Sequence, residues 1–262
     1  MKTFRILKNI SIALFSIFIC LNFTSCSNDN DSGITTKGKK LTKIEYDDWS
    51  STTFNYDKKG KLIEVSETSR DGESETYYYA WEDSIISIID PNSVANDTLY
   101  IKNGLVEKID NYETLFYNNS KKLISYKKVR SNYNNTFSCF WEQDKLSSCN
   151  INSRSGSYRT SKTITFDYDG ISCPKGCIHP IFITLSYSDD SGWVNFTEKE
   201  MFVFAHPELF GVQTTLLPTS ITYDDDNDSF NYQYEFDKNG YVSKIILIDE
   251  DGDDETYTLT WE

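Results

Sequence analysis

Short runs of strand-forming residues alternate with clusters of turn-forming residues from Leu41 to the end of the chain. Tyrosine, phenylalanine, isoleucine, valine and threonine fill the runs, and Asp, Asn, Gly and Lys fill the clusters, as in YDKKG (56–60) and FDKNG (236–240). Turns recur about every 8–12 residues, a spacing typical of antiparallel strands joined by hairpins. The pattern predicts an all-β, antiparallel meander of roughly 16–18 short strands.

A meander this wide is expected to curl or close, because a flat sheet would leave long exposed edges. We therefore predict that residues 41–262 form a single β-rich domain, a strongly curved sheet or a barrel-like structure. Prolines interrupt the strand pattern between 170 and 220. There we expect one long irregular segment, 205–219, to cross and plug the sheet, with a single helical turn at PELFG (207–211).

Two strands allow predictions about which side chains are covered. In YTLTWE (257–262), Tyr257, Leu259 and Trp261 fall on one face of a strand, and threonines fall on the other. In ETYYYAW (75–81) both faces are apolar, so we expect that strand to be covered on both sides.

Residues 1–25 have the pattern of a bacterial export signal: basic residues precede an apolar run (10–21) too short to span a bilayer as a helix. The boundary LNFTSC (21–26) resembles a lipobox, which would place a diacylglycerol on the Cys26 thiol and a further acyl chain such as palmitate on its amine. More than one chain gives stable anchoring. Because Phe23 stands where small or aliphatic residues are commoner, an ordinary cleaved signal peptide is the alternative.

Residues 26–40 comprise the acylated cysteine and a linker rich in Ser, Asn, Asp and Gly, a composition typical of flexible tethers. Asp29 and Asp31 resemble the acidic signal that sends Bacteroidetes lipoproteins to the outer face of the outer membrane. We therefore expect a lipid-anchored protein of the outer membrane that faces outside the cell. A polar linker without targeting information is the alternative.

The predicted mature chain is strongly acidic. Without residues 1–25, which hold three basic residues and no acidic ones, 23 lysines and arginines stand against 40 acidic residues, a formal charge of −17. This balance argues against nucleic acid as a partner, because phosphates require basic side chains. It argues equally against a basic membrane-binding patch. We therefore expect contact with the membrane through the lipid anchor only.

Four cysteines remain beside Cys26, an even number that suggests disulfides in an exported chain. CFWEQDKLSSC predicts a hairpin that places Cys139 opposite Cys149, and CPKGC would close a short loop between Cys173 and Cys177. A zinc site at CPKGC, with His179, is the alternative, but the spacing and an oxidising compartment disfavour it.

No motif in the sequence points to catalysis, so we expect a protein that is not an enzyme and has no catalytic residues. The two histidines, His179 and His206, each precede a proline, and no serine stands in a nucleophile-elbow context. We predict structural roles for both histidines, and neither a cofactor nor a metal. The acidic clusters at 224–228 and 249–255 suggest calcium, but neither has the bidentate Glu or the flanking helices of an EF-hand, and solvated hairpin tips explain both.

Aromatic residues beside turns are candidates for stacking on sugars. They are Trp49, Trp193 and Tyr241, although packing in the sheet is the more ordinary role of such residues and the favoured explanation for each. Ser84 and Thr98 lie in Asp-Ser/Thr-aliphatic triplets, the pattern of O-glycosylation acceptors in Bacteroidetes.

Several of these features resemble a Bacteroidetes outer-membrane lipoprotein family of unknown function with a porin-like fold. The resemblance is carried by the lipobox, by the turn strings at 56–65 and 236–245, and by LFGVQTTLLPTSITYD (209–224). A fainter similarity is to the tyrosine–aspartate repeats of large secreted shell proteins. The family implies a curved sheet or barrel over residues 41–262 and implies no activity.

Taken together, these features predict a surface-exposed lipoprotein that is a non-catalytic binding or scaffold module of the envelope. A glycan or another envelope protein is the expected partner. A glycan-acting hydrolase with a carboxylate pair and a purely structural interaction protein are the alternatives, because paired carboxylates leave no trace in a sequence. A membrane-embedded barrel is disfavoured, because Lys and Glu occupy strand positions that would face lipid.

Overall fold

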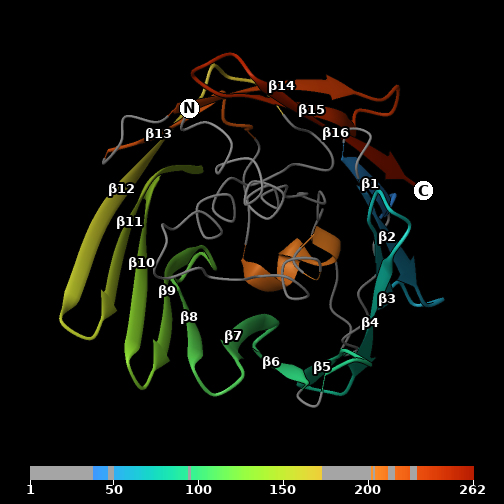
Figure 1. The fold of residues 1–262 in the computed structure, drawn as a ribbon, viewed down its shortest axis with the longest axis horizontal. Coiled ribbons are helices and arrows are strands. Elements are labelled where there is room, and N and C mark those ends of the chain that lie inside the picture. The colour runs from blue at the N-terminus through green and yellow to red at the C-terminus, as the bar shows by residue number, and fades with distance from the viewer. Residues whose placement is uncertain are drawn as a thin grey trace.

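The sheet predicted from the turn spacing closes on itself. The computed structural model describes residues 38–46, 50–93, 96–172, 202, 204–211, 216–224 and 229–262. Within these residues the chain forms one closed barrel of sixteen antiparallel strands in sequential order (Figure 1). The all-β antiparallel meander is thereby confirmed, and of the two forms that the sequence left open, a curved sheet or a barrel, the chain adopts the barrel.

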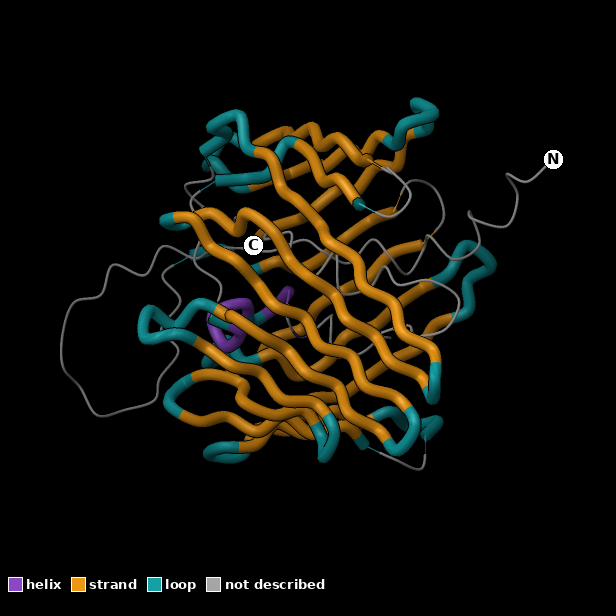
Figure 2. The backbone as a smooth tube through the Cα atoms, turned by 90° about the vertical axis from the view of Figure 1, so that its left-hand side faces the viewer, coloured by secondary structure: helices purple, strands orange, loops and turns teal. Residues whose placement is uncertain are grey.

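The strands are short, as the sequence predicted, and their bounds follow the turn clusters. They are β1 Leu41–Tyr46, β2 Ser50–Tyr56, β3 Leu62–Thr68, β4 Ser74–Trp81, β5 Ile85–Ile89, β6 Asp97–Lys102, β7 Leu105–Ile109, β8 Glu113–Tyr117, β9 Leu123–Arg130, β10 Tyr133–Glu142, β11 Lys145–Ser155, β12 Tyr158–Asp167, β13 Ser220–Tyr223, β14 Ser229–Phe236, β15 Val242–Ile248 and β16 Asp254–Trp261. Seen from the side, the strands run obliquely (Figure 2), as barrel closure requires.

Closure joins the first strand to the last. β1 pairs with β16, with Ile44 opposite Leu259 and Tyr46 opposite Tyr257. Just beyond the strands, the amide of Lys40 donates to the carbonyl of Glu262 at 2.6 Å, and the amide of Glu262 donates back at 2.9 Å. Neither terminal strand is therefore left as an unpaired edge.

Apolar side chains point into the barrel. Tyr257, Leu259 and Trp261 of β16 are buried, and Thr258 and Thr260 are exposed, as predicted. The prediction that the strand at 75–81 is covered on both sides is wrong. Tyr77 and Tyr79 are buried, whereas the side chain between them, Tyr78, is 43% exposed on the outer face.

One turn geometry recurs at three hairpins. At Asp57, Asn118 and Asp237 the side-chain Oδ1 accepts hydrogen bonds from the amides two and four residues later, at 2.8–3.0 Å. The residue three positions on has positive φ: Gly60 at 81°, Lys121 at 61° and Gly240 at 84°. Because this is a local backbone arrangement, the repeated turn strings encode a shape and carry no chemistry of their own.

A segment between β12 and β13 lies inside the barrel (Figure 1). It includes Phe202, Phe204 and the 3₁₀ turn η1 (Pro207–Phe210), and all of these residues are buried except Glu208, which is partly exposed. The plug and the helical turn at PELFG were both predicted from the sequence. Among the described residues, no helix is long and apolar enough to span a bilayer.

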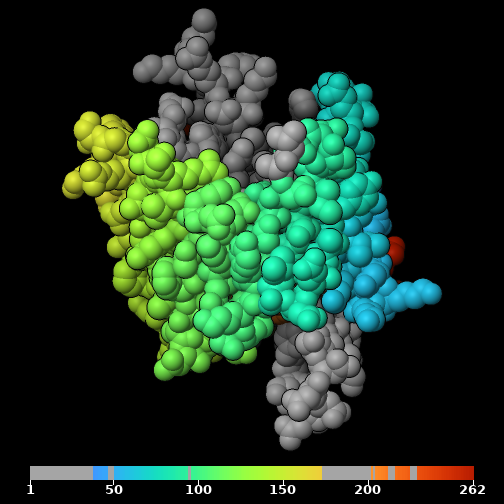
Figure 3. Space-filling view, turned by 90° about the horizontal axis from the view of Figure 1, so that it is seen from below, coloured from blue at the N-terminus to red at the C-terminus, as the bar shows by residue number. Residues whose placement is uncertain are grey.

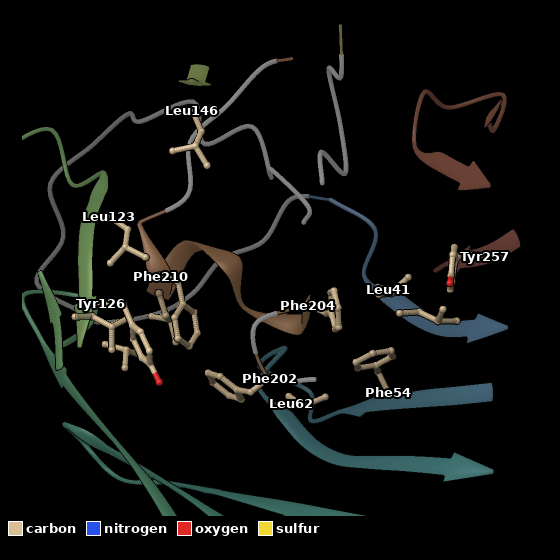
Figure 4. Packing of buried hydrophobic residues seen from close by; sticks show 14 of the residues in the cluster. Leu41, Phe54, Leu62, Leu123, Tyr126, Leu146, Phe202, Phe204, Phe210 and Tyr257 are labelled. Atoms are coloured by element: carbon tan, nitrogen blue, oxygen red, sulfur yellow. The ribbon is translucent and has the colours of Figure 1, made fainter. Parts of the chain in front are cut away.

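The plug packs against the inner wall and forms a common core with it. Figure 4 shows Phe202 and Phe204 beside Leu62 and Phe54, and Phe210 beside Tyr126. Phe202 stacks on Tyr79 with ring centroids 5.5 Å apart, and it lies 5.5 Å from the ring of Trp81. The outer surface of the same part of the wall, coloured cyan to yellow-green in Figure 3, is a continuous layer of side chains.

Gly211, which follows η1, lies in close contact with the barrel wall at Lys121 and Tyr117. Its φ is +67°, and a Cβ there would collide with the carbonyl of Lys121 and lie 2.8 Å from the ring of Tyr117. We predict that Gly211→Ala lowers the free energy of unfolding by about 3 kcal/mol, because backbone strain adds to the collision.

Gly156→Ala is the matched control. Gly156 has a similar φ of +60°, but a Cβ there meets no atom within 4 Å. It should therefore show only the strain, about 1 kcal/mol, in denaturant unfolding followed by circular dichroism. Equal losses in the two variants would show that the plug does not press on the wall at this point.

Candidate functional site at the plugged rim

Aromatic side chains form a belt of hydrogen bonds along one rim of the barrel. At or near the end of seven even-numbered strands, a Tyr hydroxyl or a Trp indole N–H donates to a carbonyl at or near the start of the preceding strand, at 2.7–3.0 Å. The aromatic donors in the described part of the chain are Tyr56, Trp81, Tyr117, Trp141, Tyr168, Tyr234 and Trp261. We call this set the rim belt.

Lysine amines lie over several rings of the rim belt. Lys40 lies 4.3 Å from the ring centroid of Tyr56, Lys61 lies 5.0 Å from Trp81, and Lys122 lies 5.1 Å from Trp141. Each of these lysines lies at or just before the start of a strand, so the hairpin repeat places it over the aromatic residue at the end of a neighbouring strand. The contacts are favourable cation–π interactions.

His206 connects the plug to the rim belt. Its side chain is 1% exposed, and its ring meets Trp81 edge to face at 5.0 Å and Tyr56 edge to face at 6.3 Å. The backbone amide of Leu62 donates to Nε2 at 3.1 Å, and Nδ1 lies 2.9 Å from Oε1 of Glu208.

These two bonds define the tautomer of His206. Because a backbone amide is only a donor, Nε2 must accept and is unprotonated. Nδ1 therefore carries the proton and donates it to Glu208. A histidine whose basic nitrogen is already bonded to the backbone cannot take a proton from a substrate without breaking that bond, so this arrangement supports the predicted structural role of His206.

The Glu208 carboxylate gives this end of the barrel an unusual electrostatic environment. Its Oε2 atom is buried and has no hydrogen-bond partner within the described segments. Burial raises the pKa of the Tyr56 hydroxyl, and the charge of Glu208 raises it further. Burial lowers the pKa of Lys40, an effect that the charges of Glu208 and Asp57 oppose. The site therefore holds the charges of Lys40 and Glu208 close together at the plugged rim.

We predict that His206→Leu destabilises the protein by about 2–4 kcal/mol, because it leaves the Leu62 amide and a Glu208 oxygen buried without partners. His206→Gln can place an acceptor near the position of Nε2, so it should lose markedly less. Urea unfolding of both variants measures the difference. If His206→Leu unfolds at the same urea concentration as the wild type, His206 does not hold the plug.

Sequence reasoning missed a second polar cluster, on the inner wall at β8–β10. Glu113 and Lys128 are directly opposite in the register and form a buried ion pair at 3.4 Å. Asn135 and Tyr133 are hydrogen-bonded beside them, and burial together with Glu113 raises the pKa of the Tyr126 hydroxyl. Breaking one partner of such a pair typically costs about 3–5 kcal/mol. Only knowledge of the strand register would have found the pair.

The predicted hairpin between the first two cysteines is confirmed. Cys139 of β10 is directly opposite Cys149 of β11, and both are buried. The two are separate thiols with their sulfurs 3.6 Å apart, so the disulfide itself stays a prediction. Burial raises the pKa of the Cys149 thiol and so disfavours the thiolate that oxidation needs. We therefore expect the bond to form before the barrel is complete.

Non-reducing peptide mapping of protein taken from the native envelope tests this pair. We expect a peptide containing both Cys139 and Cys149 that loses two mass units relative to its reduced form, since directly paired strands place the Cα atoms within disulfide range. Alkylation of both thiols in denatured, unreduced protein would contradict the prediction.

Tyr241 is not available for sugar stacking, which corrects that prediction. It is 5% exposed, its ring lies 5.1 Å from that of Trp261, and its hydroxyl accepts a bond from the amide of Lys39. The turn-like neighbours suggested exposure, but Tyr241 follows the turn at Asp237 and packs against the rim belt. Trp49 and Trp193 lie outside the described residues.

Several other predicted sites fall in or beside loops. Ser84 is exposed and Thr98 is half-buried in β6, and their glycosylation stays a prediction. Asp224 accepts a bond from the amide of Thr163 at 2.6 Å, which lowers the pKa of its carboxyl. Asp249 accepts from the amide of Asp253 across a hairpin tip. Among the described residues, no three metal-ligating side chains converge.

The remaining predicted sites lie outside the described residues. They are Cys26, Cys173, Cys177 and His179.

The architecture places the chain in the structural class of porin-like barrels. A porin-like protein from Bacteroides uniformis ATCC 8492 matches with a TM-score of 0.58 and 15% identity, over 85% of this chain and 96% of that one. A porin-like protein from Bacteroides vulgatus ATCC 8482 matches with a TM-score of 0.57 and 15% identity, over 84% of this chain and 98% of that one. At this identity the similarity concerns the fold.

No protein-family model matches the chain, and no curated protein matches it significantly. The structural matches confirm, as a fold, the porin-like barrel that the sequence resemblance implied. Because no family model matches, the lipoprotein family stays a prediction.

Proposed function

We propose that the protein is a lipid-anchored, non-catalytic binding or scaffold module of the bacterial envelope, held through Cys26 with its barrel outside the bilayer. A glycan or another envelope protein is the partner that fits a displayed module. The supporting observation is the direction of the apolar side chains. Most of them fill the barrel together with the plug, instead of forming a continuous outward band for lipid.

The outer face of the barrel supports a position in water. Lys43 and Glu45 of β1 form an ion pair at 2.7 Å on this face, and Lys244 of β15 pairs with Glu235 of β14 at 3.4 Å. A lysine on the lipid-facing side of a membrane barrel costs about 2–4 kcal/mol at the bilayer midplane. Such a surface suits a barrel that lies in water and is attached to the membrane by a tether.

The filled interior supports a module that is displayed at the membrane surface and not a channel that transports solutes. Porins of 16–18 strands enclose an aqueous channel lined by polar residues. Here Phe202, Phe204 and Phe210 occupy the interior and pack against apolar walls, and His206 fastens the segment to the rim. The geometry at His206, whose basic nitrogen is bonded to the backbone, gives no support to a hydrolase.

Labelling with a palmitate analogue in the native host tests the anchor. We expect the wild type to be labelled and to sediment with membranes, whereas Cys26→Ser should be unlabelled. Cys139→Ser, which removes a buried thiol, is the control and should be labelled like the wild type. A labelled Cys26→Ser would overturn the anchor.

A specific protease site inserted between residues 32 and 33 tests the position of the barrel. Cleavage of membranes washed in high salt, which weakens electrostatic contacts, should release the barrel without detergent, because only the acyl chains are embedded in the bilayer. If the barrel stays in the membrane until detergent is added, it is embedded in the bilayer and the proposed arrangement is wrong.

A further inference from the structure

We propose that the outer wall of β6–β10 is a docking surface for an anionic lipid bilayer. The barrel would then lie on its side against the membrane that carries its anchor. This inference rests on the proposed function, because the tether keeps the wall near that membrane. It adds a second contact to the lipid anchor, and we call the surface the basic wall.

Exposed apolar side chains concentrate on the basic wall. Nine large apolar side chains are exposed within the described residues, and five of them belong to these strands. They are Tyr100 (36% exposed), Phe116 (41%), Ile124 (39%), Val129 (51%) and Phe140 (48%). On the opposite side, by contrast, β14 and β16 expose Asn231, Gln233, Thr258 and Thr260, and Phe236 is the one large apolar side chain that these two strands expose.

The strand register makes these side chains one surface. Tyr100 is opposite Lys108, Lys108 is opposite Thr114, and Thr114 is opposite Lys127. Lys108 lies 5.5 Å from the ring centroid of Tyr100, and Lys127 lies 5.2 Å from that of Phe116. This row therefore places Lys108 and Lys127 on the outer face of the wall, each beside an exposed aromatic ring.

The charge of the basic wall is opposite to that of the rest of the chain. Residues 97–142 hold seven lysines and arginines and five acidic residues, a formal charge of +2 in a predicted mature chain of −17. One charge of each sign, Glu113 and Lys128, cancels inside the barrel. The net charge of the whole chain, on which we based our expectation of no basic membrane-binding patch, hides this local excess of positive charge.

The chemistry of the wall suits a bilayer better than a glycan. Phenylalanine, isoleucine and valine offer no hydrogen bonds to sugar hydroxyls, whereas they partition into the region between headgroups and acyl chains. Lysine stems can lie along that region with their amines at the phosphates, and aromatic rings favour it. Figure 3 shows the strands of this wall, in green, as a continuous surface, which suits a broad partner.

Vesicle sedimentation of the mature chain, residues 26–262, tests the basic wall. Cys26→Ser is introduced so that no acyl chain contributes to binding. We expect binding to vesicles that contain phosphatidylglycerol, weaker binding as salt is raised, and little binding to pure phosphatidylcholine. Equal binding to both lipids, or binding to neither, would overturn the proposal.

Matched variants locate the surface. The double variant Lys108→Gln and Lys127→Gln should weaken binding at least tenfold, since each lysine near an anionic surface contributes about fivefold. Lys43→Gln with Lys244→Gln makes the same charge change on another part of the outer wall and should bind as the parent does. Phe116→Ser should weaken binding, and Phe236→Ser, which alters an equally exposed phenylalanine (40%), should not.

Circular dichroism confirms that each variant is folded before binding is compared. Losses as large in the control variants as in the wall variants would overturn the assignment. The absence of an acyl chain on Cys26 would overturn the proposed lipid anchor alone. It is measured by acyl labelling and does not affect vesicle binding, which uses a chain without the anchor.

Discussion

The width of the closed sheet is the constraint on which the rest of the structure depends. Inward side chains fill a barrel of about eight strands, but sixteen strands enclose far more space than such side chains can occupy. Because the inner wall here is apolar, water in that space would be unfavourable. The chain supplies its own filling, in which Phe202, Phe204 and Phe210 extend the core across the interior.

Filling a barrel also requires that the filling be held in place. Two contacts serve this purpose: the bond from the Leu62 amide to His206, and the close approach of Gly211 to Lys121 and Tyr117. Both are made at the rim belt, where aromatic residues are already fixed by bonds to backbone carbonyls. The repeated hairpin thus builds a rigid ring, and the plug is attached to that ring.

The sequence allowed the strand pattern to be predicted because turns and alternation are local. The alternation in YTLTWE and the facing cysteines at 139 and 149 follow from spacing within one strand or one hairpin. Tyr78 and Tyr241 were misplaced because burial depends on which neighbours the closed sheet provides. Glu208, Lys128 and the basic wall depend on register across several strands and on the position of the plug, which spacing alone does not encode.

The pairing of β1 with β16 has a consequence for how the protein is made. The first strand of the barrel to be synthesised finds its second neighbour only when the last strand follows it. Until then, the growing sheet has two open edges and an uncovered apolar face, the features that promote aggregation. Folding of this chain should therefore be helped by chaperones that protect unfinished sheets.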